Sequence, residues 1–126
     1  MGTWGAGNLD SDTGRDELRE RTDELVKSIM DTARLKSSRA ADEYDHDVLF
    51  VEFEILFALH EKDLFTTGED IPAEQEIEDL MQDYIKDWDA YIDGLEPTAD
   101  HKRERRRVIL ETFDRFKQIC QEFRDR

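Results

Sequence analysis

The sequence has one cysteine, Cys120, among its 126 residues, so no internal disulfide can form. A disulfide-stapled fold is thereby excluded, and one thiol is typical of a protein kept in a reducing cytoplasm. No apolar run approaches the roughly 20 residues that a membrane-spanning helix needs. The residues up to Thr13 also lack the basic and then apolar pattern of a secretion signal. These absences predict a cytoplasmic protein that makes no contact with a membrane.

Basic side chains are scarce in the middle of the chain. Residues 40–100 contain 20 Asp and Glu but only two bases, Lys62 and Lys86. Residues 1–39 and 101–126 contain the other 13 acids and 16 bases, so the formal net charge of −15 arises in the middle. This uneven distribution favours cationic partners and repels nucleic acid and anionic membranes. The alternative is a surface adapted to high salt, where the acidity serves solubility alone.

Apolar residues are also few, at 37% of the chain against 40% charged residues. That balance is typical of amphipathic helices around a small core. Seven Phe, three Tyr and two Trp argue against disorder, and the length predicts one domain over residues 1–126. The apolar spacing predicts four helices, over about 13–36, 44–65, 72–93 and 99–124. The expected fold is therefore an all-α bundle.

The second of these segments admits two structures. Alternate residues from Val51 to Phe57 are apolar, with Glu52 and Glu54 between them, which is a strand pattern. The remaining residues of 44–65 are also largely apolar, as in a helix that is buried nearly all round. We favour the central helix, because an isolated strand would lack a partner for its backbone.

A glycine-punctuated lead-in, residues 1–11, precedes the first predicted helix. Three of its glycines permit tight turns: Gly2, Gly5 and Gly7. We expect Trp4 to fold back onto the first helix as an apolar plug, with its indole N–H bonded to an acceptor. Asp12 or Thr13 is expected to cap that helix, and Pro72 to begin the third.

One face of the third predicted helix carries a row of acids: Glu76, Asp79, Asp83 and Asp87. Like charges at these spacings repel one another by a few tenths of a kcal/mol per pair. The row is either an ordinary solvated face or a binding face for a basic protein partner. The aromatic-rich apolar stripe of the same helix offers a second kind of contact, with another copy of the chain. The basic run that follows, residues 101–107, is expected to neutralise the protein's own acids rather than to bind nucleic acid.

Potential metal ligands are incomplete. Asn8, Asp10 and Asp12 have the spacing of a calcium loop, but Thr13 replaces its glycine and Arg19 its glutamate. Glu43 and His46 form one Glu-x-x-His pair of the kind found in di-iron bundles, which need a second pair and two inward glutamates. Glu54 is the best candidate for an inward glutamate. No metal or cofactor is predicted.

Catalytic signatures are also lacking. Cys120 lies on the apolar stripe of the fourth predicted helix, so we expect a buried, inert thiol. Glu52 and Glu54 lie inside an apolar segment, where a buried carboxylate has a raised pKa and suits acid–base chemistry. The alternative is a structural role, such as binding the indole of Trp4 or Trp88. No catalytic residue is assigned.

The opening residues, MGTWGAGNLDSDT, resemble the start of a bacterial family of unknown function. Its members begin Met-Gly-x-Trp-Gly-x-Gly-x-Phe and continue with an acidic Asn/Asp-Asp pair. The matching residues are Met1, Gly2, Trp4, Gly5, Gly7 and Asp12. Leu9 replaces the usual Phe, Ser11 stands where Asn or Asp is common, and Glu54 matches a central glutamate in an apolar helix. The resemblance implies a small cytoplasmic helical protein and brings no activity, cofactor or catalytic residue.

Three functions are compatible with these features. The first is a non-enzymatic interaction protein that binds a basic protein partner, as immunity proteins neutralise bacterial toxins. The second is a DNA mimic, whose carboxylates imitate phosphates and occupy a nucleic-acid-binding protein. The third is a metal-dependent enzyme that uses Glu43, His46, Glu54 and acids of the third predicted helix. We favour the first, because acid is concentrated on one helix and catalytic motifs are missing.

Overall fold

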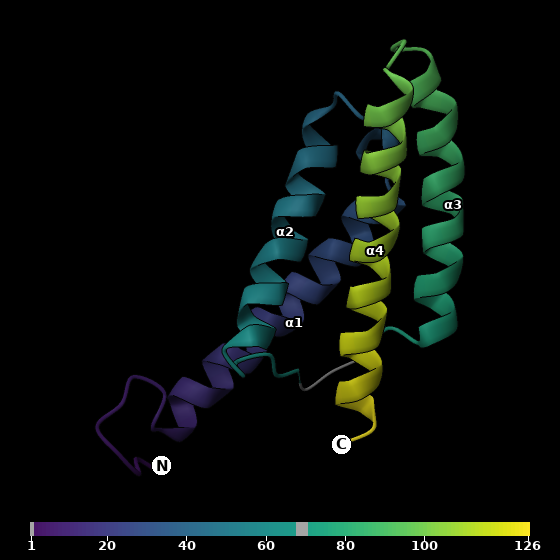
Figure 1. Cartoon of the computed structure of the whole chain (residues 1–126). Helices are drawn as coiled ribbons and strands as arrows, with labels where there is room; N and C mark the ends of the chain where they lie inside the picture. The colour runs from purple at the N-terminus through teal and green to yellow at the C-terminus, as the bar shows by residue number, and fades with distance from the viewer. Residues whose placement is uncertain (1, 68–70) are drawn as a thin grey trace.

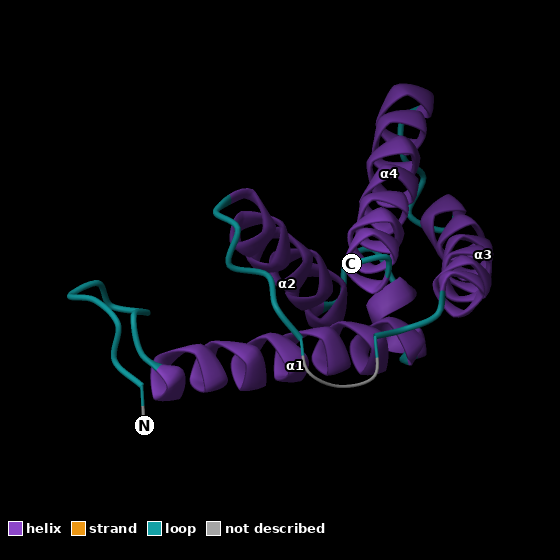
Figure 2. Ribbon diagram, turned by 90° about the horizontal axis from the view of Figure 1, so that it is seen from below, coloured by secondary structure: helices purple, strands orange, loops and turns teal. Residues whose placement is uncertain are grey.

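Four α-helices make up the fold, so the prediction of an all-α bundle is confirmed. The computed structural model describes residues 2–67 and 71–126. Its helices are α1 (Asp12–Arg34), the 3-10 helix η1 (Lys36–Arg39), α2 (Tyr44–Glu61), α3 (Glu74–Asp93) and α4 (Ala99–Arg124). α3 and α4 form an antiparallel hairpin, and α1 crosses behind the other helices (Figures 1 and 2). The lead-in and the first turns of α1 project beyond the bundle at one corner.

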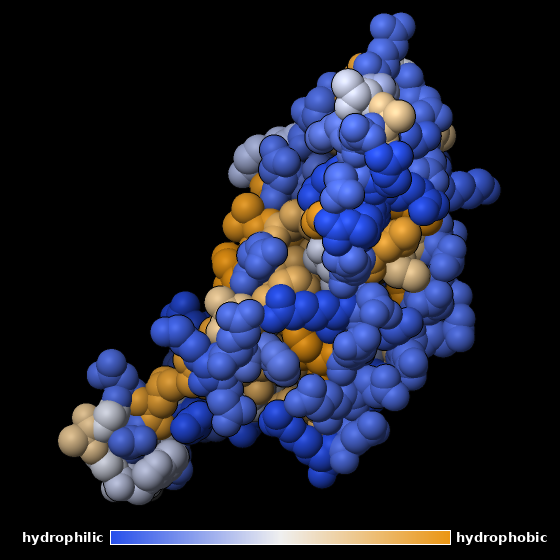
Figure 3. Space-filling model, viewed as in Figure 1, coloured by the Kyte–Doolittle hydropathy of each residue, from blue (hydrophilic) through white to orange (hydrophobic). Residues whose placement is uncertain are grey.

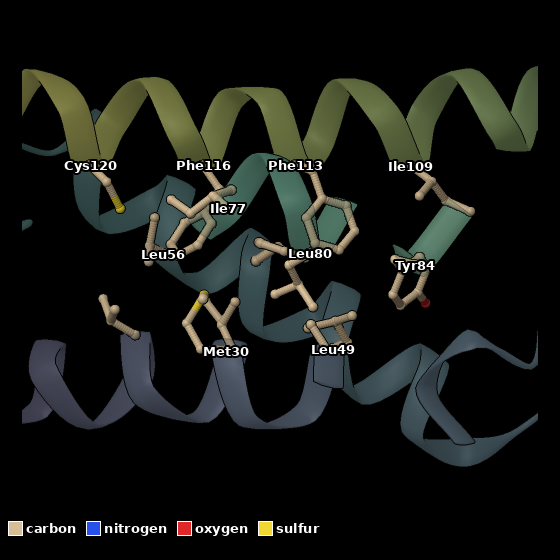
Figure 4. Close-up of a cluster of buried hydrophobic side chains, with 14 of the residues drawn as sticks. Met30, Leu49, Leu56, Ile77, Leu80, Tyr84, Ile109, Phe113, Phe116 and Cys120 are labelled. Atoms are coloured by element: carbon tan, nitrogen blue, oxygen red, sulfur yellow. The ribbon is translucent and has the colours of Figure 1, made fainter. Parts of the chain in front are cut away.

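The core is an aromatic cluster at the centre of the bundle. Phe53 of α2 is fully buried and meets the rings of Phe113 and Phe116 on α4, with centroids 5.1 and 5.4 Å apart. Figure 4 shows side chains of α4 pointing toward α2 and α3, with Met30 of α1 closing the opposite side. Because all four helices contribute to this cluster, the helical interpretation of α2 is correct and the strand alternative is wrong.

The N-terminal cap of α1 differs from the prediction. Ser11, rather than Asp12 or Thr13, is the N-cap, and its hydroxyl accepts a hydrogen bond from the Gly14 amide at 3.0 Å. Asp12 instead bonds the lead-in: its carboxylate accepts from the Gly2 amide at 2.7 Å. The serine hydroxyl satisfies one of the amides that a helix N-terminus leaves unbonded.

The third helix also begins later than the sequence suggests. Ala73 is extended and is the N-cap of α3, which starts at Glu74, so Pro72 lies just outside the helix. The connection between α1 and α2 contains η1, whose Ser38 and Arg39 are buried. This short helix therefore belongs to the packed interior rather than to a surface loop.

The predicted plug of Trp4 is wrong. Trp4 is 56% exposed, because the lead-in forms its own turn at the free end of α1, away from the core (Figure 1). Its backbone amide bonds the Asp10 carbonyl at 3.0 Å. The Asp10 carboxylate accepts from the Gly7 amide at 2.8 Å, and a Cβ added at Gly7 would lie 2.6 Å from that carboxylate. Gly7 is thus needed for the close approach, and the lead-in is held by local polar contacts.

Candidate functional site

Two of the four acids predicted to form a binding face on α3 are bound within the fold. Glu76 accepts a hydrogen bond from Arg34 of α1 at 2.6 Å, and Asp87 accepts one from Arg39 of η1 at 2.7 Å. The Arg39 side chain is only 11% exposed and also donates to a carbonyl at the end of α1. These two acids therefore hold α3 against α1 and η1.

The other two acids of the row face solvent. Asp79 is exposed, and among the described residues its carboxylate accepts one hydrogen bond, from Gln75 one turn earlier, at 2.8 Å. Asp83 is exposed and has no ion pair or side-chain hydrogen bond with any described residue. The surface open to a partner on this helix is thus narrower than the sequence predicts, with two carboxylates one turn apart.

The basic run 101–107 neutralises the protein's own acids, as expected. Lys102 pairs with Asp93 at 2.6 Å, and Arg106 holds both carboxylate oxygens of Asp89 from 3.0 Å. Both acids are on α3, so these pairs join the two helices of the hairpin. Most of the apolar stripe of α3 packs inside the core, whereas Tyr91 of the same stripe is 38% exposed.

Arg105 is the exception in this run, because it forms no ion pair with a described residue and instead joins a buried polar cluster, with the charge of Asp47 nearby. Its guanidinium lies 4.5 Å from the ring centre of Phe50 and 3.0 Å from Nε2 of His46. A guanidinium only donates, so Nε2 accepts and the imidazole proton sits on Nδ1. Nδ1 lies 2.9 Å from the Ser38 carbonyl and 2.8 Å from the Tyr84 hydroxyl, which also donates to that carbonyl.

This cluster joins four elements and serves the fold. Burial lowers the pKa of His46, an effect that the Ser38 carbonyl opposes and the charge of Arg105 reinforces. Burial likewise raises the pKa of the Tyr84 hydroxyl. Both ring nitrogens of His46 are occupied by neighbours, so neither offers a lone pair to a ligand. The sequence points to this cluster only weakly, through a histidine within an apolar segment.

The potential metal ligands are not brought together. Glu54 is exposed, so its prediction as an inward glutamate is wrong, and Glu43 is exposed as well. The His46 ring is buried and contacts Ser38 of η1 and Tyr84 of α3 instead of a carboxylate of the proposed set. Across residues 2–67 and 71–126 no group of three His, Cys, Asp or Glu side chains could hold a metal ion. The Asp10 and Asp12 carboxylates bind backbone amides of the lead-in.

Two buried groups, the Cys120 thiol and the Trp88 indole, test predictions about reactive and structural side chains. Cys120 is buried as predicted, and burial raises the pKa of its thiol to about 12, so almost none of it is thiolate at neutral pH. The indole nitrogen of Trp88 is buried and has no hydrogen-bond partner among the described residues. Binding of the Trp88 indole by Glu52 or Glu54, one of the structural roles suggested for these two residues, is therefore wrong.

Many acids have no ion pair with any described residue. Among residues 2–67 and 71–126, nine arginines form ion pairs with nearby carboxylates. Acids outnumber Lys and Arg by 15 in the chain, so internal pairing leaves many carboxylates without a cation. On α2 and at its N-cap the acids without an ion pair are Glu43, Asp45, Asp47, Glu52 and Glu54. The space-filling view shows mostly hydrophilic surface, interrupted by apolar side chains around α2 (Figure 3).

Comparison with protein-family models, curated proteins and solved structures found no match to this chain. The N-terminal resemblance to a bacterial family therefore stays a prediction. In the part of the chain that the structure describes, no helix has both the length and the apolar character to cross a membrane.

Proposed function

We propose that this chain is a non-enzymatic interaction protein that binds a basic protein partner. The observation that carries the proposal is the excess of exposed carboxylates after internal pairing, such as Asp79 and Asp83 on α3 and Asp47 and Glu54 on α2. Ion pairs join the basic residues of the flanks to acids of the same chain, so the uncompensated acids dominate the outer field. A field of one sign speeds association with a partner of the other sign and selects against wrong partners.

The basic partner that we propose is a bacterial toxin. Neutralisation of such a toxin by a small acidic immunity protein is an analogy of charge and size. A cytoplasmic location belongs to the proposal, because the one cysteine forms no internal disulfide. The DNA-mimic and metal-enzyme alternatives gain no observation of their own. Glu76 and Asp87 are held in ion pairs, and Glu54 is exposed whereas His46 is buried.

The test is affinity capture from a lysate of the source cells at about 0.15 M salt. The bait proteins are the wild type, the double variant Asp79→Lys/Asp83→Lys, and a matched control, Asp125→Lys, at the end of α4. We expect the wild type and the control to retain a basic protein that the double variant loses. Equal, empty captures from all three would favour an acidity that serves solubility alone.

A further inference from the structure

A groove between α2 and α4 lies on a different surface from the exposed α3 acids. Its volume is about 640 Å³. Its walls are formed by Asp47, Val51, Glu54 and Ile55 on α2 and by Val108 and Thr112 on α4, with Phe50 and Arg105 at its base. In Figure 3, apolar side chains surface along α2 and in the hollow beside α4. Sequence reasoning did not predict this exposed groove, because α2 is apolar nearly all round and was therefore expected to be buried on every side.

The residues that line the groove lie on one face of α2 and one face of α4. On α2 the lining residues form two rows on one helix face, Asp47–Val51–Ile55 and Phe50–Glu54–Ala58, each at steps of four, over about 16 Å of the helix axis. This length corresponds to about three turns of a third helix laid between α2 and α4. The groove therefore has the shape into which a helical segment of a partner packs.

The apolar residues of the groove are unusually open to solvent. Val51 is 58% exposed, Ile55 49% and Val108 37%. Three of the eight large apolar residues exposed on the described surface thus line this groove. A contiguous apolar patch rimmed by polar residues is typical of an interaction site.

The rim of the groove is acidic. Asp47 and Glu54 are exposed, and neither forms an ion pair with any residue in the described ranges. Arg105 is the one base among the lining residues; its guanidinium lies over the Phe50 ring, donates a hydrogen bond to His46 and has the charge of Asp47 nearby. A ligand lying over Val51 and Ile55 would therefore meet carboxylates along its sides.

We propose that this groove seats an amphipathic helix of a basic protein partner. Apolar side chains of that helix would cover Val51, Ile55 and Val108, and Lys or Arg beside its apolar stripe would meet Asp47 and Glu54. This inference rests on the proposed function, and it assigns the groove as the docking surface for the basic partner. A second copy of the chain fits less well, because two molecules of charge −15 repel and would bring acidic rims together.

The test uses two fluorescein-labelled peptides of about 18 residues and identical composition, built from Leu, Lys and Ala. In the patterned peptide the Leu residues fall on one helix face, and in the scrambled peptide they do not. Binding is measured by fluorescence anisotropy for the wild type, for Val51→Ser/Ile55→Ser and for Asp79→Lys/Asp83→Lys. All four substituted positions are exposed, and circular dichroism checks that each variant is folded.

We expect the wild type to bind the patterned peptide at least about tenfold more tightly than the scrambled one. The Val51→Ser/Ile55→Ser variant should lose that preference, and Asp79→Lys/Asp83→Lys should keep it. Equal binding of both peptides, abolished in the α3 variant, would overturn the groove and leave the proposed function standing. Binding of neither peptide would overturn both. A wild-type dimer in sedimentation that Val51→Ser/Ile55→Ser dissociates would assign the groove to a second copy instead.

Discussion

The guanidinium of Arg39 and the carboxylate of Asp87 form an ion pair of 2.7 Å that joins η1 to α3. Asp87 belongs to the row of acids that the sequence predicts as a binding face, yet its partner is almost completely buried. Part of the acidity of α3 is thus used to hold the fold together. Two acids of the same row, Asp83 and Asp87, should therefore respond differently to substitution.

Replacement of Asp87 by Asn should lower the free energy of unfolding by about 1–3 kcal/mol, because a largely buried guanidinium loses its charged partner. Replacement of Asp83 by Asn, in the same helix and exposed, should change it by less than about 0.5 kcal/mol. Urea unfolding followed by circular dichroism measures both values. Equal effects of the two substitutions would show that the Arg39–Asp87 pair does not stabilise the fold.

Stability should depend on pH through His46. Burial lowers the pKa of His46 below the ordinary value of 6.5, so in acid the unfolded chain takes up a proton that the folded protein resists. The contribution of this group is therefore complete above about pH 6.5 and is lost as the pH falls below that value. The charged and polar groups that surround the His46 ring or act on its pKa are Arg105, Tyr84, the Ser38 carbonyl and the Asp47 carboxylate.

The measurement is the free energy of unfolding between pH 7 and about pH 5.5 for the wild type and for His46→Gln. We expect a decline toward acid in the wild type and a flatter profile in the variant, since glutamine cannot take up the proton. His60 and His101 remain in both proteins and serve as an internal control. Identical profiles would remove His46 as the cause.

The thiol of Cys120 should be unreactive in the folded protein. It is buried, and burial raises its pKa to about 12. A thiol reagent at pH 8 should therefore modify the native protein only on the timescale of unfolding, and modify it rapidly in guanidinium chloride. Fast modification of the native protein would contradict the packing of α4 against the core.

The two tryptophans should be distinguishable by their exposure to solvent. Trp4 is 56% exposed and Trp88 is completely buried. Substitution Trp4→Phe should therefore remove most of the fluorescence that acrylamide quenches and shift the remaining emission to shorter wavelength. Unchanged quenching in that variant would place Trp4 against the protein, as the sequence suggests.

The helices were predictable because their apolar residues repeat at steps of three and four. It was also predictable that Lys102 and Arg106 would pair with acids of the same chain, because a basic run follows an acidic helix in the sequence. Which acids are paired was not foreseeable: Glu76 meets Arg34 across 42 residues of sequence, and Asp87 meets Arg39 across 48. Those contacts depend on how the helices cross, which spacing within one helix does not determine.

Exposure was the other property that the sequence did not determine. Trp4 is apolar enough to suggest burial, but the lead-in lies at the free end of α1, beyond the core (Figure 1). Val51 and Ile55 lie on the same helix as Phe53, and only one side of that helix meets α1 and α4. An all-round apolar helix gives no hint of which side remains open.

The dissociation constant of the captured basic partner, measured at low and high salt, tests the central claim most directly. The wild type should bind at least about tenfold more weakly at 0.5 M than at about 0.05 M salt, because exposed charges are screened. Asp79→Lys/Asp83→Lys should bind more weakly at low salt and depend less on salt. An affinity that changes neither with salt nor with these substitutions would contradict binding through the uncompensated acids.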